Sequence, residues 1–291
     1  MKVSFITTVL NEAKTINDLL DSLQQQTQKP DEIIIIDAGS TDQTIKLIKS
    51  HSLKTKLIIK KGFNPSQARN FAIKQAKHSI LALSDAGCRL DKHWLKRITQ
   101  PFKNKQVDAV AGFYLPDAKT VFQKCLAPFV VVIPDKLDKK TFLPSSRSIA
   151  FRKSAWQKAG QYPEHLRFCD DLVFAANLKR ATNMKVEPQA IVHWYQDKNL
   201  FQFFNQIKNY ASGDVQAKYK PHLKRIYTTF GRYLIFISLP IVFPLYLLWP
   251  IVKHFRYVNH PLAIIYLPIL QITADIGIML GSLYGLLKRR S

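Results

Sequence analysis

Residues 31–42 read DEIIIIDAGSTD, an unbroken apolar run between acids that leads into a polar segment with one glycine. Strands that are apolar at every position, rather than at alternate positions, are typical of sheets that are covered on both faces. Sheets of that kind are mostly parallel and belong to α/β proteins, in which helices cover the two faces. This stretch therefore favours an α/β fold.

The sequence around this stretch alternates between two patterns. Residues 2–9, 53–61 and 79–85 are short apolar runs with the length of strands. Residues 15–26 and 65–77 have apolar side chains at helical spacing. Such alternation predicts a parallel sheet with helices on both faces.

Polar residues follow three of the predicted strands. Asn11 and Glu12 follow the first strand, residues 37–42 follow the second, and Asp85 follows the fourth. Ligands of open α/β sheets bind beyond the carboxyl ends of the strands, so these clusters are candidates for one site. Each cluster alone also fits a structural role, because Ser, Thr and Asp after a strand are common caps of the next helix.

The middle of the chain is less regular. We expect a strand at residues 108–115, a helix at 170–182 and a closing strand that ends on His193 and Trp194. The helix begins with Asp170 and Asp171, whose negative charge suits the positive end of a helix dipole. A structural role therefore also explains the two acids, and packing against a neighbour also explains the histidine.

The last part of the chain is much more apolar than the rest. Residues 233–252 carry no charge, and residues 261–287 carry only Asp275. A run of about 20 apolar residues spans the hydrocarbon core of a bilayer. We therefore expect a pair of hydrophobic, transmembrane helices with both ends in the cytoplasm, and we expect prolines to kink the first of them. A re-entrant pair and two buried core helices are the alternatives.

The chain is strongly basic, with 43 lysines and arginines against 20 acidic residues and a net charge of +23. Nucleic acid or an anionic membrane surface would explain this balance. The basic residues are scattered and no nucleic-acid-binding motif accompanies them, so we favour a membrane and expect no nucleic acid. Three separate cysteines and the lack of a recognisable signal peptide favour a cytoplasmic catalytic part.

Four sequence motifs follow one another along the chain: TTVLNEAKTI (7–16), PDEIIIIDAGSTDQT (30–44), NPSQARNFAIKQAK (64–77) and ILALSDAGCRLDKHWL (80–95). Together they resemble the nucleotide-binding half of family 2 glycosyltransferases, which have the GT-A fold. Residues 148–182 are similar to the acceptor half of that family. Residues 191–214 are similar to a segment of its membrane-attached members. The likeness extends over residues 2–217.

The resemblance implies a domain organisation. Residues 1–225 would form a Rossmann-like GT-A domain, with a nucleotide-sugar-binding half at 1–110 and an acceptor half at 111–225. Residues 226–291 would form a C-terminal membrane region that contains the two hydrophobic segments.

The family's motifs also imply a site for a nucleotide-sugar donor. Asp37 matches an acid that accepts hydrogen bonds from the nucleobase or ribose, and Ala38 stands where members often have a second acid. Arg69, in an Ala-Arg-Asn motif, would face the diphosphate, because a planar guanidinium suits phosphate oxygens. The residues implied at the donor are Thr8, Asn11, Glu12, Asp37, Gly39, Ser40, Arg69 and Asp85.

A divalent cation, Mg²⁺ or Mn²⁺, is implied by the same resemblance. Asp85 matches the first acid of the family's Asp-X-Asp motif, but Gly87 stands at the second position. With Asp85 as a single carboxylate, phosphate oxygens, water and His193 would complete the coordination, since Mg²⁺ commonly keeps water. The alternative is a loosely bound or absent metal, with Arg69 and nearby lysines balancing the phosphate charge.

The acidic pair has a catalytic counterpart in the family. Asp171 matches the general base of inverting transfer, and Asp170 replaces the usual glutamate before it. Gln206 and Tyr210 match a motif of processive members only in part, which favours transfer of a single sugar.

The sequence is thus identified as a membrane-attached, inverting glycosyltransferase of the hexosyltransferase type. We expect it on the cytoplasmic side of the cell's inner membrane, in cell-envelope glycan biosynthesis, with a lipid, lipid-linked or glycan acceptor. A catalytically inactive nucleotide-sugar-binding scaffold is an alternative because of Gly87. A nucleotidyltransferase is a weaker alternative, because residues 7–15 lack the glycines of a phosphate-binding loop.

Overall fold

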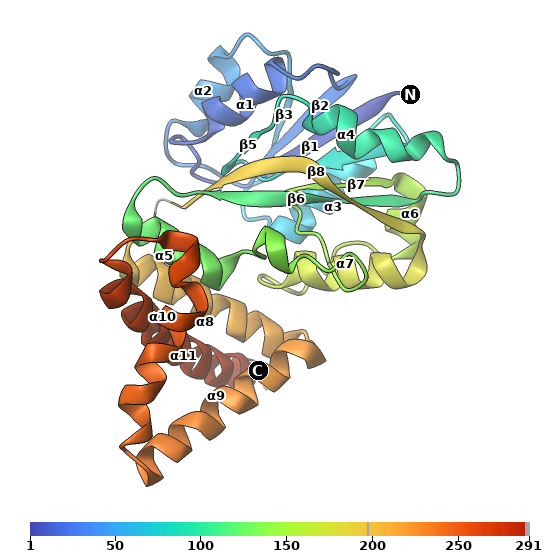
Figure 1. Cartoon of the computed structure of the whole chain (residues 1–291). Coiled ribbons are helices and arrows are strands. Elements are labelled where there is room, and N and C mark those ends of the chain that lie inside the picture. The colour runs from blue at the N-terminus through green and yellow to red at the C-terminus, as the bar shows by residue number, and fades with distance from the viewer. Residues whose placement is uncertain (197, 289–291) are drawn as a thin grey trace. The chain divides into compact units, whose positions relative to one another are not determined.

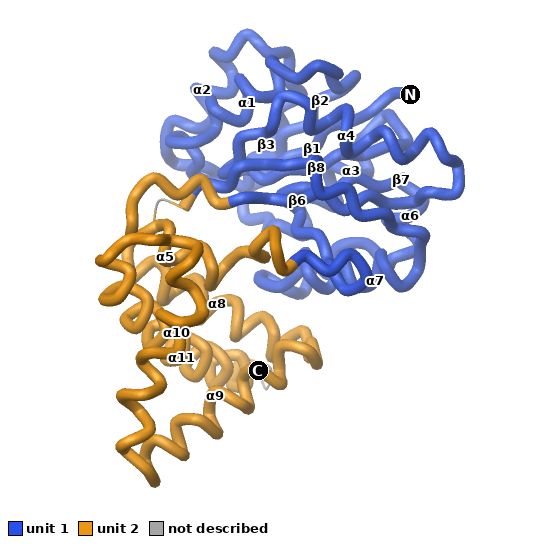
Figure 2. Tube along the Cα trace, in the orientation of Figure 1, with its two compact units in different colours: residues 1–115, 137–195 blue, residues 116–136, 196–291 orange. Residues whose placement is uncertain are grey.

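The structure is a computed structural model that describes residues 1–196 and 198–288. The chain folds into two compact units (Figure 2). The first unit comprises residues 1–115 and 137–195, and the second comprises residues 116–136 and 196–291. The functional domain boundary expected at residue 225 stays a prediction.

The first unit is built on one eight-stranded mixed sheet (Figure 1). In sheet order its strands are β3 (Lys56–Ile59), β2 (Glu32–Asp37), β1 (Val3–Val9), β4 (Ile80–Leu83), β7 (Ile149–Arg152), β6 (Ala109–Asp117), β8 (Met184–Tyr195) and β5 (Cys88–Leu90). The strands β1 to β4 are parallel, as the alternation of strand and helix predicts. Beyond them the sheet is mixed, because β7 runs antiparallel to both β4 and β6, and β5 runs antiparallel to β8.

Helices cover both faces of this sheet, with α1, α2 and α4 on one face and α3, α6 and α7 on the other (Figure 1). Residues Ile33 to Ile36 of β2 are buried, which explains the unbroken apolar run. The helix α3 begins at a capping box between Asn64 and Gln67. The helices of this unit are α1 (Ile16–Gln24), α2 (Thr44–Ser50), α3 (Pro65–Gln75), α4 (Trp94–Thr99), the 3₁₀ helix η1 (Gln100–Lys103), α6 (Lys153–Lys158) and α7 (Asp170–Ala181).

The described part of the second unit is mostly helical, apart from the end of β6. Its helices are α5 (Val121–Val130), the 3₁₀ helix η2 (Pro134–Lys136), α8 (Leu200–Gln216), α9 (Lys220–Ser238), α10 (Val242–Val258) and α11 (Ala263–Lys288). The apolar run 233–252 does not form one helix, because α9 ends at Ser238 and α10 begins at Val242. Leu239 leaves the helical conformation, as expected for a residue before proline, and Pro240 cannot continue the hydrogen-bonded ladder.

A stripe of glycines lets α11 approach α8 very closely. Gly277, Gly281 and Gly285 recur every four residues and therefore lie on one face of α11. A Cβ atom on Gly281 would lie only 2.1 Å from the carbonyl oxygen of Lys208, and one on Gly285 only 2.7 Å from that of Ser212. The contact between these two helices therefore depends on the absence of side chains.

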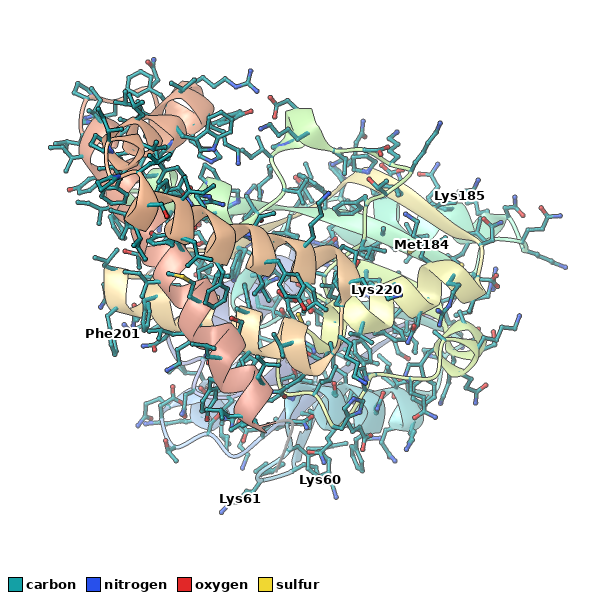
Figure 3. The ribbon with its side chains drawn as sticks, turned by 90° about the horizontal axis from the view of Figure 1, so that it is seen from below. Lys60, Lys61, Met184, Lys185, Phe201 and Lys220 are labelled. Carbon is teal, nitrogen blue, oxygen red and sulfur yellow. The ribbon has the colours of Figure 1, made fainter. Side chains whose placement is uncertain are left out.

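The second unit exposes many large apolar side chains. Ile237, Ile241 and Val252 on and between α9 and α10 are each more than three-quarters exposed. Phe201, near the start of α8, is 70% exposed and points away from its helix (Figure 3). Within the described residues, α11 is the one helix that has the length and apolar composition to cross a membrane, so the expected second spanning helix is not found there.

Candidate active site

Strand register brings the three polar clusters of the sequence to one edge of the sheet. Val9 at the end of β1 pairs with Asp37 at the end of β2. On the other side of β1, Ile6 pairs with Leu83, which ends β4 just before Asp85. The segments that begin at Asn11, Asp37 and Asp85 therefore all leave the same edge.

Asp37 organises the turn that follows β2. Its Oδ1 accepts hydrogen bonds from the backbone N–H groups of Gly39 and Ser40, both at 2.8 Å. Gly39 has φ +111°, a conformation that glycine adopts without strain. Asp37 is fully buried, and its Oδ2 has no hydrogen-bond partner in the described residues. One carboxylate oxygen of Asp37 therefore fixes the turn, and the other is buried without a hydrogen-bond partner in the described residues.

The loop after β1 is tied to the same turn. Asn11 has φ +57°, which its short polar side chain tolerates. Its side-chain oxygen accepts a hydrogen bond from the N–H of Thr41 at 2.8 Å, and its own N–H donates to Ser40 Oγ at 2.9 Å. The N–H of Glu12 donates to Thr44 Oγ1 at 2.8 Å. Thr8 lies just before this loop in β1 and is partly exposed.

Arg69 joins two acids that are distant in the sequence. Its Nη2 lies 3.0 Å from Asp85 Oδ1, and its Nη1 lies 2.8 Å from Asp170 Oδ2. Ser66, one turn earlier on α3, donates a further hydrogen bond to the same Asp170 oxygen at 3.0 Å. The guanidinium is buried, and although burial opposes its charge, Asp85 and Asp170 raise its pKa further above the ordinary value. Arg69 therefore stays charged and fixes both carboxylates.

Asp170 holds its proton more tightly than an ordinary aspartate. Burial raises the pKa of its carboxyl to about 6, because desolvation outweighs the opposing effect of Arg69. The neighbouring Asp171 adds repulsion in the same direction. A pKa raised on folding means that protonated Asp170 stabilises the fold, and that this stabilisation is lost as pH rises through about 6.

A pH titration of stability tests this shift. Between pH about 4 and about 7, the free energy of unfolding of the wild type should fall relative to that of Asp170→Asn, which has no carboxyl to ionise. Urea unfolding at several pH values measures both curves. Parallel curves over this window would contradict the raised pKa.

Asp171 takes part in a different contact. Its Oδ2 accepts a hydrogen bond from Ser145 Oγ at 2.9 Å. The same hydroxyl oxygen accepts a hydrogen bond from Arg147 Nη1 at 2.8 Å. Ser145 and Arg147 were not predicted as site residues, because they lie in an irregular loop before β7, and no spacing in the sequence links them to Asp171.

Arg147 contacts both Trp194 and Asp85, two residues close to the missing second acid. Its guanidinium lies 3.8 Å from the centre of the Trp194 ring, and its Nε lies 3.9 Å from Asp85 Oδ2. A Cβ atom on Gly87 would lie 4.0 Å both from Trp194 Nε1 and from Glu12 Oε2. The Glu12 carboxylate thus reaches the space next to the position where the family's second acid would begin.

His193 is not among the residues that these contacts bring together. It pairs with Arg89 between β8 and β5, while its neighbour Trp194 faces Gly87. Successive side chains of a strand point to opposite faces, so His193 points away from the face that Trp194 occupies. Its assignment as a metal ligand stays a prediction.

The carboxylates near position 87 suit a hard divalent cation in their chemistry. Mg²⁺ prefers oxygen ligands, keeps several waters and commonly uses one or two protein carboxylates. Asp85, whose side chain is 28% exposed, and Glu12 supply such oxygens. Arg69 and Arg147 also face Asp85, so phosphate groups that enter here would meet positive charge from the protein itself.

Comparison with known proteins assigns the chain to a family. The family model described as glycosyl transferase family 2 matches residues 4–155, which contain β1 to β4 and the Arg69–Asp85 pair. The chain belongs to glycosyltransferase family 2. Membership of this family argues against the nucleotidyltransferase alternative.

Similar proteins include two O-antigen chain rhamnosyltransferases. The chain is 30% identical over 196 residues to the O-antigen chain rhamnosyltransferase RfbN of Salmonella typhimurium strain LT2. This match covers 62% of each protein. It is 29% identical over 177 residues to the O-antigen chain rhamnosyltransferase WbaN of Salmonella anatum. That match covers 57% of this chain and 56% of the relative. The matches thus span less than two thirds of either relative's own length.

Solved structures confirm the GT-A-like α/β fold. The mannosyltransferase PcManGT from Pyrobaculum calidifontis, in complex with GDP-Man and Mn²⁺, superimposes with a TM-score of 0.65. That match has 17% identity and covers 94% of this chain and 86% of the other. S. aureus TarS 1–349 in complex with UDP-GlcNAc matches with a TM-score of 0.58 at 18% identity, over 99% of this chain and 93% of the other.

Proposed function

We propose that this protein is a membrane-attached, inverting glycosyltransferase that moves a sugar from a nucleotide-sugar to a hydroxyl of a lipid, lipid-linked or glycan acceptor. The observation that carries this proposal is the Arg69 bridge between Asp85 and Asp170 in a chain of family 2. That bridge links the motif for the donor diphosphate to the acidic pair that precedes α7.

The donor binds along the edge where β1, β2 and β4 end. Thr8, Asn11 and Glu12 line one side of it, and the turn from Asp37 through Gly39 to Ser40 lines another. The hydrogen bonds between these two loops support this role, because they fix both loops before the donor arrives. Arg69 and Arg147 then face the diphosphate, and each guanidinium offers planar donors to phosphate oxygens.

Asp171 acts as the general base. It removes the proton from the acceptor hydroxyl as that oxygen forms a bond with the anomeric carbon. The bond between the anomeric carbon and the diphosphate oxygen breaks on the opposite side, and its electron pair leaves with the nucleotide. The hydrogen bond from Ser145 supports this assignment, since it orients the carboxylate without neutralising it. Asp170 keeps Arg69 in place and acts as a positioning residue.

Asp85 and Glu12 would hold a divalent cation, Mg²⁺ or Mn²⁺, near Gly87. When bound, it neutralises charge on the leaving diphosphate. The relative in complex with Mn²⁺ and the donor chemistry of the two carboxylates support this proposal. His193 is not required for it.

Removal of the cation ligands should weaken donor binding. We expect Asp85→Asn to weaken the Mn²⁺-dependent binding of the nucleotide-sugar about tenfold or more, and Glu12→Gln to do so about threefold to tenfold, because each loses a carboxylate charge. Calorimetric titration of the donor with Mn²⁺ or with EDTA measures this effect, and Asp21→Asn on the exposed surface of α1 serves as control. Equal affinity in Mn²⁺ and EDTA would contradict a cation at this site.

Membrane attachment is proposed for the second unit. Support comes from the exposed apolar side chains of α9 and α10, from the length and composition of α11, and from the net charge of +23. We propose that these helices hold the catalytic residues at the cytoplasmic face of the inner membrane, where lipid-linked acceptors are concentrated.

The acceptor class can be tested directly. Radiolabelled sugar should enter the organic phase when the protein, its donor and a membrane lipid extract are incubated together. Label that appears only in water-soluble glycans would contradict a lipid-linked acceptor while leaving the glycosyltransferase itself intact.

A further inference from the structure

The second unit contains a pocket of about 860 Å³ that none of the site residues lines. Its walls come from α5, α9, α10 and α11. Phe236, Leu245 and Trp249 form apolar parts of the wall, whereas Arg225, Arg232 and Lys253 form basic parts. The pocket thus combines an apolar surface with a group of cations.

The pocket carries more positive than negative charge. Asp275, buried on α11, is its one acidic wall residue, and its Oδ2 lies 3.3 Å from Arg232 Nη1. Tyr246 and Gln271 donate hydrogen bonds to the same carboxylate at 2.5 and 3.1 Å. The Asp275 carboxylate also attracts Arg225, but it is a single acid against the three basic side chains of the wall.

In the part of the chain that the structure describes, neither Arg225 nor Lys253 lies within ion-pair distance of a carboxylate, although Asp275 and Asp214 attract Arg225 from farther away. The pKa of the Lys253 ammonium is lowered, first by burial and then by repulsion from Lys136, Arg225 and Arg232. An anion between Arg225 and Lys253 would relieve this repulsion. A phosphate group supplies such an anion, with oxygens that suit both side chains.

The apolar wall continues onto the outer surface of the unit. Ile235, Leu245 and Trp249 line the pocket and are each more than half exposed. Leu248 and Val252 lie next to them on α10 and are exposed as well. An alkyl chain whose head lies in the pocket can therefore contact exposed apolar side chains of α9 and α10.

We propose that this pocket binds a membrane amphiphile with a phosphate head group, such as an alkyl or prenyl phosphate. The phosphate lies between Arg225 and Lys253, and the chain lies against Phe236 and Trp249. Each half of the ligand thus meets a wall of matching chemistry. The inference goes beyond the proposed transfer reaction, because the bound amphiphile need not be the acceptor of the sugar.

Fluorescence of Trp249 provides a local readout of this binding. The probe is an alkyl phosphate whose chain carries bromine, a quencher of indole fluorescence, and the matched probe is the brominated alcohol of the same chain. The full-length protein is titrated in detergent without any donor, so the result is independent of glycosyltransferase activity. Trp249→Phe identifies the part of the quenching that arises in the pocket, because the other three tryptophans of the chain belong to the first unit.

We expect the alkyl phosphate to quench Trp249 at about one tenth or less of the concentration that the alcohol requires. The double variant Arg225→Gln, Lys253→Gln should abolish this preference, whereas Lys224→Gln, an exposed neighbour outside the pocket, should preserve it. Arg225 and Lys253 remain accessible to solvent although their charged ends are partly desolvated, so we expect the double variant to keep the wild-type circular dichroism spectrum.

Three results would overturn the proposal. Equal quenching by the alcohol would mean that only apolar partition occurs. An unchanged preference in the double variant would mean that the two cations do not bind the phosphate. Inorganic phosphate that competes as strongly as the alkyl phosphate would mean that the pocket binds free phosphate rather than an amphiphile.

Discussion

In Asp171→Asn, the rate of sugar transfer should fall about a thousandfold, while the dissociation constant of the nucleotide-sugar stays within about threefold of the wild type. The amide keeps an oxygen that accepts the hydrogen bond from Ser145, so the local geometry is retained. It cannot accept the proton of the acceptor hydroxyl, and the acceptor oxygen must then attack while still protonated. Initial rates with a saturating donor measure the loss, and donor titration measures the affinity.

The surface variant Asp21→Asn controls for the loss of a negative charge, because Asp21 lies on α1 and pairs with His51. Its rate should match that of the wild type. An Asp171→Asn variant that kept more than about a tenth of the wild-type rate would show that another group acts as the base.

Gly281→Ala should destabilise the second unit by about 3 kcal/mol, an unusually large effect for the addition of one methyl group. The new Cβ atom would lie 2.1 Å from the carbonyl oxygen of Lys208, so α11 and α8 would have to separate. Backbone atoms cannot turn aside as a flexible side chain can. Thermal unfolding of the full-length protein in detergent measures the change.

Gly231→Ala is the matched control. Gly231 lies within the helix α9, and a Cβ atom there meets no atom within 4 Å. Alanine is the better helix former by about 1 kcal/mol, so this variant should be as stable as the wild type or slightly more stable. Similar stability of the two variants would contradict the close contact between α8 and α11.

The sequence alone predicted the elements whose pattern is local. The apolar run of β2 and the acidic start of α7 both follow from neighbouring residues, and both elements are present. The common edge of Asn11, Asp37 and Asp85 followed from one general rule about the ends of parallel strands. The catalytic and binding roles assigned to these residues stay predictions until they are measured.

Contacts between distant segments could not be predicted in this way. Arg69 and Asp170 are 101 residues apart, and only the packing of α3 beside α7 brings them together. The contact between Ser145 and Asp171 depends on an irregular loop that has no periodic pattern. The family resemblance indicated roles for Arg69, Asp170 and Asp171. It gave no indication of Ser145 or Arg147.

In the C-terminal region the sequence predicted the apolar composition but not the arrangement of the helices. Composition alone suggested that residues 233–252 form one spanning helix, but a break at Pro240 divides them between α9 and α10. The four-residue spacing of Gly277, Gly281 and Gly285 was visible in the sequence, yet only the structure shows that α8 is the helix it contacts. Apolar composition thus gave the character of the region but not its arrangement.

The most direct test of the central claim is nucleotide release. The full-length protein, purified in detergent, is incubated with UDP-, GDP- and dTDP-sugars, with and without a membrane lipid extract, beside Asp171→Asn. We predict release of nucleotide from one class of donor, stimulated by the extract and lost in the variant. Absence of release from every donor in the presence of the extract would contradict the account and favour a catalytically inactive scaffold.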